Sequence, residues 1–154
     1  MYNHAPKDYK CPICPAVKGL ENEVTYIKQT DLVYKDELVS AFINSFFIEG
    51  NLGHVIIVPN KHSENIYDMP EEYIRQISEV SKKIAGAMKT AYSCDGITTL
   101  QNNEPAGDQH AFHFHFHVFP RYKDDNLHAN LSHKRLTTPE ERSPYAEKLK
   151  EHLK

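Results

Sequence analysis

The sequence lacks the long apolar run that a membrane helix requires. Its most apolar stretches, within 41–48 and 55–59, are far shorter than the roughly 20 residues needed to cross a bilayer. Residues 1–8 also lack the basic start and the apolar core of a secretory signal. We therefore expect a protein with no membrane partner that resides in the cytoplasm.

Excess positive charge is missing as well. Lysine and arginine together number 18 against 21 aspartate and glutamate residues, a formal net charge of −3. Such a balance gives no uniform positive field to hold a nucleic-acid backbone, so a nucleic-acid polymer is not expected as a partner. Internal repeats, low-complexity tracts and Gly/Ser linkers are absent too. We expect residues 1–154 to form a single domain.

Cysteine is scarce, and three cysteines do not make a disulfide framework. Two of them form Cys11-Pro12-Ile13-Cys14, a spacing that suits metal binding or redox chemistry. Pro12 and Pro15 around Cys14 oppose the immediate helix that a thioredoxin-like motif requires. Cys94 has no basic neighbour in the chain, and we expect it to be an ordinary buried thiol.

The periodicity of apolar residues predicts an α+β fold with an antiparallel sheet. Strands are expected at 38–43, 53–58, 97–101 and 111–119, with the first two paired to each other. The segment 44–52 is expected to be a long loop. A main helix of about five turns is predicted to follow Asp68, which would cap it, and a short terminal helix is predicted to begin at Ser143.

The most informative segment is the strand expected at 111–119, where histidines alternate with apolar residues. Because side chains alternate across a strand, His113, His115 and His117 should project from one face. A neutral imidazole can attack phosphorus near pH 7, while a second histidine holds phosphate oxygens. Histidines at this spacing can also bind zinc. The spacing alone therefore leaves nucleophilic catalysis and metal binding open.

Three stretches taken together closely resemble the histidine-triad (HIT) family. They are 53–62 (GHVIIVPNKH), 102–109 (NNEPAGDQ) and 113–121 (HFHFHVFPR). The resemblance runs in order over about 32–121 and includes the long helix between the motifs. It implies a five-stranded antiparallel sheet with one long helix, to which the periodicity adds a short C-terminal helix. It also implies a homodimer in which two protomers extend the sheet.

The resemblance implies roles for individual residues. His115 would be the nucleophile, forming a covalent nucleotidyl-imidazole intermediate that water then cleaves, with no catalytic metal required. His117 would contact the phosphate and assist the leaving group. Gln109 would contact the phosphate, and Asn103 would contact the phosphate or ribose region. Asn44 lies near the family's ribose-binding acidic position.

A structural zinc site is also implied by the resemblance. Some histidine-triad proteins and the related galactose-1-phosphate uridylyltransferases bind zinc through an N-terminal Cys-x-x-Cys, an upstream histidine and the first histidine of the triad. By residue match the ligands here would be Cys11, Cys14, His62 and His113, a donor set suited to closed tetrahedral zinc. Residues 1–30 would then be a zinc-binding extension, and 122–154 a C-terminal tail and helix.

The expected function is that of a nucleotide phosphohydrolase or nucleotidyl transferase that attacks the α-phosphorus of a nucleotide or dinucleotide. The ending 117–121 favours hydrolysis of dinucleoside polyphosphates, and a nucleoside phosphoramidase is an alternative. Two further hypotheses belong to other classes of protein. One is a zinc-dependent hydrolase with His113, His115 and His117 as ligands, and the other is a nucleotide-binding regulator with little turnover.

Overall fold

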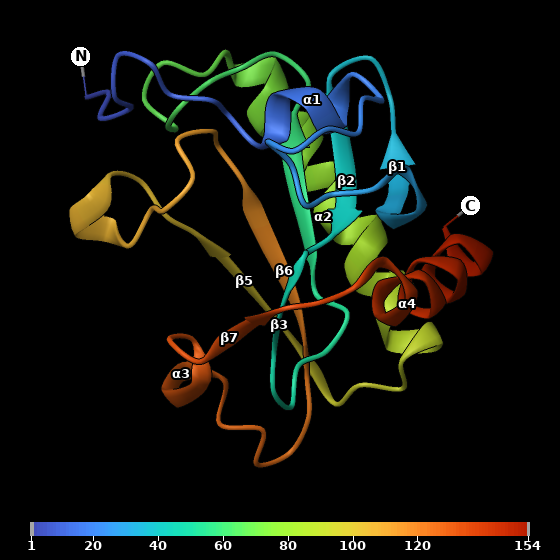
Figure 1. Ribbon diagram of the computed structural model, residues 1–154. Coiled ribbons are helices and arrows are strands. Elements are labelled where there is room, and N and C mark those ends of the chain that lie inside the picture. Colours follow the sequence, from blue (N-terminus) through green and yellow to red (C-terminus); the bar gives the residue numbers. More distant parts are fainter. Residues whose placement is uncertain (1, 154) are drawn as a thin grey trace.

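The centre of the molecule is a five-stranded antiparallel sheet with the strand order β1-β2-β4-β6-β5 (Figure 1). A computed structural model describes residues 2–153, so Met1 and Lys154 of the expected 1–154 domain lie outside the described residues. The strands are β1 (Leu32–Lys35), β2 (Val39–Ile43), β4 (Val55–Pro59), β5 (Gly96–Gln101) and β6 (Phe116–Arg121). The α+β class, the five-stranded sheet and the pairing of β2 with β4 are confirmed.

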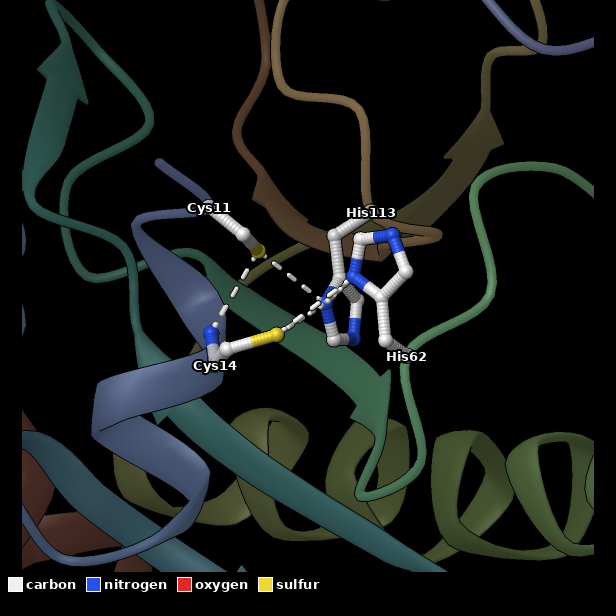
Figure 2. A group of neighbouring side chains, drawn as sticks. All are labelled: Cys11, Cys14, His62 and His113. Carbon is white, nitrogen blue, oxygen red and sulfur yellow. Dashed lines mark hydrogen bonds between the residues drawn. The ribbon is translucent and has the colours of Figure 1, made fainter. Parts of the chain in front are cut away.

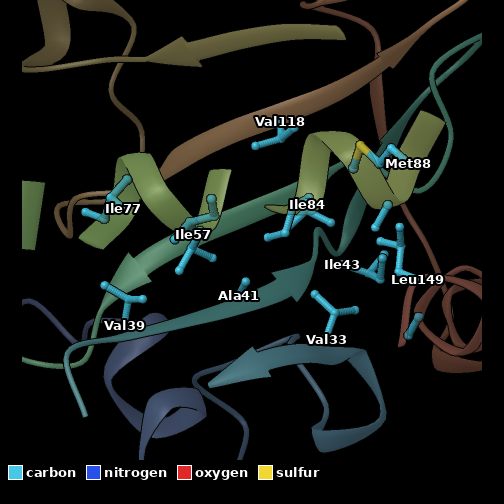
Figure 3. Close-up of a cluster of buried hydrophobic side chains, with 14 of the residues drawn as sticks. Val33, Val39, Ala41, Ile43, Ile57, Ile77, Ile84, Met88, Val118 and Leu149 are labelled. Carbon is cyan, nitrogen blue, oxygen red and sulfur yellow. The ribbon is translucent and has the colours of Figure 1, made fainter. Parts of the chain in front are cut away.

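One face of this sheet carries the main hydrophobic core. The long helix α2 (Glu71–Ala91) turns its apolar stripe toward that face, where Ile77, Ile84 and Met88 pack with Ile57 and Val118 (Figure 3). Burying one such side chain completely contributes about 1.5–3 kcal/mol, so this stripe is the main reason that α2 stays on the sheet. Across residues 2–153, every helix is too short or too polar to span a bilayer.

The start of α2 differs from the sequence prediction. The helix begins at Glu71, directly after Pro70, and no side chain caps its first turn. The expected cap at Asp68 is therefore wrong. Glu71 and Glu72 place negative charge in the first turn, which stabilises the positive end of the helix dipole without a cap.

The C-terminal helix α4 (Pro139–His152) begins four residues earlier than predicted. Thr138 and Glu141 form a capping box, in which the Thr138 hydroxyl accepts from the Glu141 amide and the Glu141 carboxylate accepts from the Thr138 amide. Two backbone donors are satisfied by this reciprocal pair, so the helix starts there and Pro144 lies inside it. The predicted start at Ser143 is wrong.

The segment 44–52 is more than a loop. It contains the short strand β3 (Phe46–Ile48), which pairs with a strand that the sequence did not indicate, β7 (Lys134–Leu136). Phe47 is buried against the ring of Tyr145 in α4, at 5.4 Å between centroids. Strands of three residues are too short to show a period of two, and this explains why the prediction failed here.

The predicted strand 111–119 begins only at Phe116. Its ladder with β4 ends at the pair of Ile57 with Phe116, and β4 itself ends at Pro59, which has no N–H to donate. The preceding amides find partners in loops instead: Phe114 donates to the Ser63 carbonyl at 2.7 Å. His113 and His115 therefore lie on an irregular segment just before β6.

The second face of the sheet is covered at two ends. The helix α1 (Ile13–Val17) and Ile27 pack over Phe42 and Ile56 at one end. At the other end lie β3, β7 and the short helix α3 (Leu127–Asn130), which Figure 1 shows on the opposite side of the molecule from α1. His54, directly before β4, and His117 of β6 lie on this face between the two covers.

Candidate functional site

His113 is fully buried, and its hydrogen bond defines its tautomer. Nε2 lies 3.0 Å from the Pro59 carbonyl oxygen, which can only accept, so Nε2 carries the proton. Nδ1 then presents a lone pair on the other side of the ring. Burial lowers the pKa of His113 to about 3, which keeps the ring neutral at physiological pH.

The lone pair of His113 faces three other potential ligand atoms (Figure 2). Its Nδ1 lies 3.3 Å from Cys11 Sγ, 3.7 Å from Cys14 Sγ and 3.2 Å from His62 Nδ1. All four ligand atoms lie within 4.8 Å of one another. A tetrahedral zinc with usual bond lengths would separate sulfur and nitrogen by about 3.5 Å and two nitrogens by about 3.3 Å. The four residues expected as zinc ligands are thus brought together at the spacing of such a site.

The electrostatics of this cluster also fit a divalent cation. Burial and the neighbouring Cys11 raise the pKa of the Cys14 thiol to about 12, so two thiolates in this position need a positive charge between them. The Nδ1 atoms of His62 and His113 face each other, an arrangement that a shared metal satisfies. The residues present therefore fit zinc, with the Pro59 carbonyl orienting His113 from behind.

His115 directs one ring nitrogen to the backbone and leaves the other free. Nδ1 lies 2.7 Å from the His113 carbonyl oxygen and must donate to it, so Nε2 carries the lone pair. Burial lowers the pKa of His115; the hydrogen bond to the His113 carbonyl acts in the opposite direction, and the charges of Lys134 and His110 act in the same direction as burial. The ring is therefore neutral, oriented and able to act as a nucleophile at Nε2.

His117 lies next to His115, with ring centroids 5.0 Å apart. Its ring stacks on Phe119 at 5.4 Å, and the pKa of His117 lies well below its usual value because of burial. Within residues 2–153, His117 Nδ1 is buried and has no hydrogen-bond partner. The two histidines expected to be catalytic are thus adjacent on the open part of the second face.

A fourth histidine, His54 of the segment entering β4, belongs to the same cluster and was missed by the sequence analysis. Its ring stacks on Phe119 at 4.4 Å and lies 5.6 Å from His117, and its exposed fraction is only 2%. Burial lowers its pKa to about 3. Alternation with Ile56 and Val58 could have placed His54 on this face, but the register of β4 with β6 was needed to bring it to His117.

The residues expected to contact substrate are held by hydrogen bonds within the chain. Asn44 follows β2, donates from its backbone to the His54 carbonyl and accepts the Phe46 amide on its side chain. The Asn103 side chain bonds Gln101 and accepts the Ile66 amide at 2.8 Å. Both side chains are engaged locally, and their contacts with a nucleotide stay predictions.

Gln109 is only 3% exposed, and its side chain stabilises its loop through hydrogen bonds. Its amide nitrogen donates to the Glu64 carbonyl at 2.6 Å, and its oxygen accepts the Glu104 amide at 2.8 Å. A contact between Gln109 and phosphate would require one of these bonds to be exchanged. That role also stays a prediction.

Comparisons with known proteins identify a family model and several relatives to which the chain is similar in sequence. The model of the HIT domain matches residues 27–124. The protein hit of Bacillus subtilis is 37% identical over 90 residues, covering 58% of this chain and 61%, less than two thirds, of that relative. An uncharacterized HIT-like protein of Borreliella burgdorferi is 34% identical over 121 residues, 77% of this chain and 81% of the relative. Adenosine 5'-monophosphoramidase HNT1 of Saccharomyces cerevisiae is 35% identical over 69 residues, which cover 45% of this chain and 41% of that relative.

Solved structures share the fold. A Hit-like protein from Bartonella henselae, described as involved in cell-cycle regulation, has a TM-score of 0.76 at 28% identity and covers 95% of this chain and 98% of its own. A zinc-bound histidine triad family protein from Mycobacterium smegmatis has a TM-score of 0.74 at 24% identity and covers 94% of this chain and 93% of its own. Diadenosine triphosphate hydrolase of Plasmodium falciparum has a TM-score of 0.71 at 16% identity and covers 98% of this chain and 87% of its own.

Proposed function

The chain belongs to the HIT family, and we propose that it cleaves nucleotides at the α-phosphorus through a covalent intermediate on His115. The observation that carries the proposal is the 2.7 Å bond from His115 Nδ1 to the His113 carbonyl. This bond fixes the tautomer that exposes the Nε2 lone pair, and burial keeps that lone pair unprotonated.

The reaction would proceed in two displacements. In the first, His115 Nε2 attacks the α-phosphorus, a P–N bond forms, and the bond from phosphorus to the leaving oxygen or nitrogen breaks. In the second, water attacks the same phosphorus, the P–N bond to His115 breaks, and the ring returns to its neutral form as the nucleoside monophosphate leaves. His117 would contact the phosphate and assist the departing group, which its position 5.0 Å from His115 supports.

A structural zinc would support this site from behind. Cys11, Cys14, His62 and His113 would hold it, and bound zinc would supply a rigid tetrahedral anchor. Because His113 also provides the carbonyl that orients His115, a fixed His113 positions the nucleophile. The zinc-bound protein of Mycobacterium smegmatis shares this fold and is compatible with the proposal.

The geometry favours this mechanism over a hydrolase that uses the triad as zinc ligands. His113 turns Nδ1 toward the cysteines, and its Nε2 is engaged by Pro59. Among the residues that the structure describes, the group spaced for a metal ion contains His113 but neither His115 nor His117. The three histidines of the triad therefore do not converge on one point.

Two similar proteins indicate two classes of substrate. HNT1 is a phosphoramidase by name, and the Plasmodium falciparum structure is that of a diadenosine triphosphate hydrolase. We propose dinucleoside polyphosphates as the substrates of this chain, with nucleoside phosphoramidates as the second candidate. We also propose a homodimer, for which β5, an outer strand of the sheet, offers an edge that a second copy can extend.

The test is turnover of diadenosine tetraphosphate and of adenosine 5'-phosphoramidate by the wild-type protein and by His115→Asn. We expect the wild type to release AMP and the variant to lose turnover by a factor of about 10³ or more, while a fluorescent AMP analogue still binds. A brief exposure to chelator should leave the initial rate unchanged. Immediate loss of activity on chelation, with turnover retained in His115→Asn, would instead assign the chemistry to a metal. Binding without turnover in the wild type would indicate a regulator.

A further inference from the structure

The small sheet of β3 and β7 brings a lysine to the histidine face. In its antiparallel register Lys134 lies opposite Ile48, so the two side chains project from the same side of the small sheet. Ile48 is 4% exposed and packs in one cluster with Phe119 and Leu127. The side of the small sheet that carries Lys134 is therefore turned toward the face of the main sheet that carries Phe119.

Phe119 is the ring on which the histidines stack. His54 lies 4.4 Å from it and His117 lies 5.4 Å from it, centroid to centroid. Ile48 therefore belongs to the same buried cluster as the ring on which His117 stacks. Lys134 is the partner of Ile48 across the strands. Lys134 is thus linked to the histidines through its strand pair with Ile48 and through the ring of Phe119.

The ammonium group of Lys134 is available to a ligand. Its side chain is exposed, and Nζ lies 5.7 Å from the ring centroid of Phe46. Among residues 2–153 it enters no ion pair, whereas its neighbour Arg135 pairs with Glu141 at 2.8 Å. The aromatic face of Phe46 holds the amine without neutralising its charge.

The charge of Lys134 reaches the reacting groups. It contributes, after burial, to the lowered pKa of His54, and together with the neighbouring histidines to that of His117. In a protein with a net charge of −3, this is a local positive field at the place where an anionic substrate would sit.

We propose that Lys134 binds the phosphate chain beyond the phosphate attacked by His115, and that it selects substrates with several phosphates over those with one. This inference rests on the proposed function, since it assigns the substrate class of the same site. In the proposed mechanism, His115 and His117 contact the phosphate that is attacked. A second or third phosphate carries further negative charge, and Lys134, which enters no ion pair among residues 2–153, is a cation that can bind it.

The experiment compares Lys134→Gln with wild type on diadenosine tetraphosphate and on adenosine 5'-phosphoramidate. A charged hydrogen bond to phosphate predicts a fall in kcat/KM of about tenfold or more for the polyphosphate, mainly through KM, and of less than about threefold for the phosphoramidate. Lys134→Arg should restore most of the difference. Lys82→Gln is the matched control, because Lys82 lies on α2, behind the sheet.

Equal effects on both substrates, or no effect on either, would overturn the assignment. Equilibrium binding of a non-hydrolysable, methylene-bridged diadenosine polyphosphate separates this failure from that of the proposed function. If the wild type turns over neither substrate, the proposed function fails. The binding measurement still decides about Lys134: tenfold weaker binding in Lys134→Gln supports it, and unchanged binding contradicts it.

Discussion

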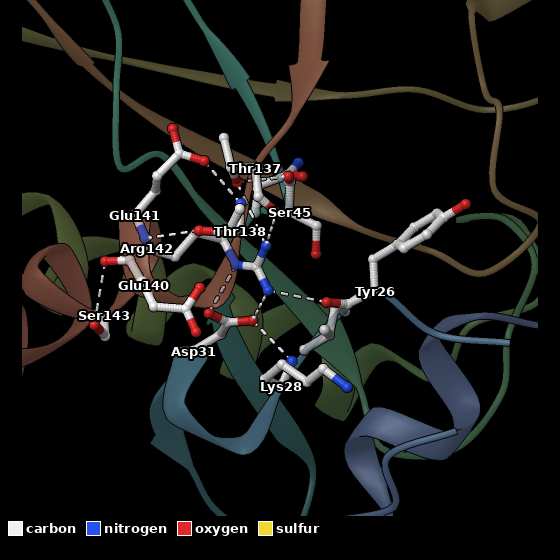
Figure 4. Close-up of polar contacts among 12 residues, drawn as sticks. Tyr26, Lys28, Asp31, Ser45, Thr137, Thr138, Glu140, Glu141, Arg142 and Ser143 are labelled. Carbon is white, nitrogen blue, oxygen red and sulfur yellow. Dashed lines mark hydrogen bonds and ion pairs between the residues drawn. The ribbon is translucent and has the colours of Figure 1, made fainter. Parts of the chain in front are cut away.

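Replacement of Arg142 should be among the most destabilising single changes in this protein. Arg142 is 1% exposed and Asp31 is fully buried, and the guanidinium donates to both carboxylate oxygens at 2.8 and 2.9 Å (Figure 4). It also donates to the Thr137 carbonyl at 2.5 Å and to the Tyr26 carbonyl at 3.0 Å. One side chain thus joins α4 to the segment that leads into β1.

The magnitude follows from burial. Truncation to alanine leaves the Asp31 carboxylate without its partner in a site closed to water, which costs about 3–5 kcal/mol of unfolding free energy. For a chain of this length, each kcal/mol lowers Tm by about 2–4 °C, so Arg142→Ala should melt about 6–20 °C lower. Arg135→Ala is the matched control. The Arg135 side chain is 55% exposed and its pair with Glu141 contributes less than about 1 kcal/mol.

Urea unfolding of Arg142→Leu, Asp31→Asn and the double variant provides the assay. Removing either partner leaves the other buried and unpaired, whereas removing both does not. The double variant should therefore be destabilised by much less than the sum of the two single variants. Additive effects, or a loss of under about 1 kcal/mol in Arg142→Ala, would contradict a strong coupling between these two buried side chains.

Other predictions concern pH, metal and backbone. Because the pKa of His54 falls from 6.5 to about 3 on folding, the unfolded chain binds a proton first as pH falls. Lowering pH from 7 to 5 should then cost about 2 kcal/mol from this residue, and in urea titrations His54→Phe should lose that much less than wild type. Zinc analysis should give one ion per chain, lost in Cys14→Ser and kept in Cys94→Ser; equal zinc in both would contradict the site. Gly53 has φ +76°, and a Cβ there would lie 2.3 Å from the Tyr145 ring, so Gly53→Ala should unfold at clearly lower urea than Gly107→Ala.

The sequence was sufficient for the elements that are long or strictly periodic. The stripe of α2 and the paired runs of β2 and β4 appear where they were expected, because burial of one face determines both. The HIT motifs also indicated the four residues spaced for zinc before any distance was known. Matching residue types at matching positions carried that prediction.

What the sequence could not give depends on contacts between distant segments. The pair of β3 with β7, and with it the position of Lys134, has no local signature. His54 joins the site through the register of β4 with β6. The irregular turn of the chain at His113 and His115 follows from the end of β4 at Pro59 and from the hydrogen bond of His113 to the Pro59 carbonyl, whereas strict alternation predicted a continuous strand.

The most direct test of the account is the mass of the intact protein after rapid acid quench during turnover of diadenosine tetraphosphate. We expect a transient species heavier by one adenylyl group, located by peptide mapping on His115 and absent in His115→Asn. It should form in the presence of chelator. Turnover without any such adduct, or an adduct located on another residue, would contradict the central claim that His115 is the nucleophile.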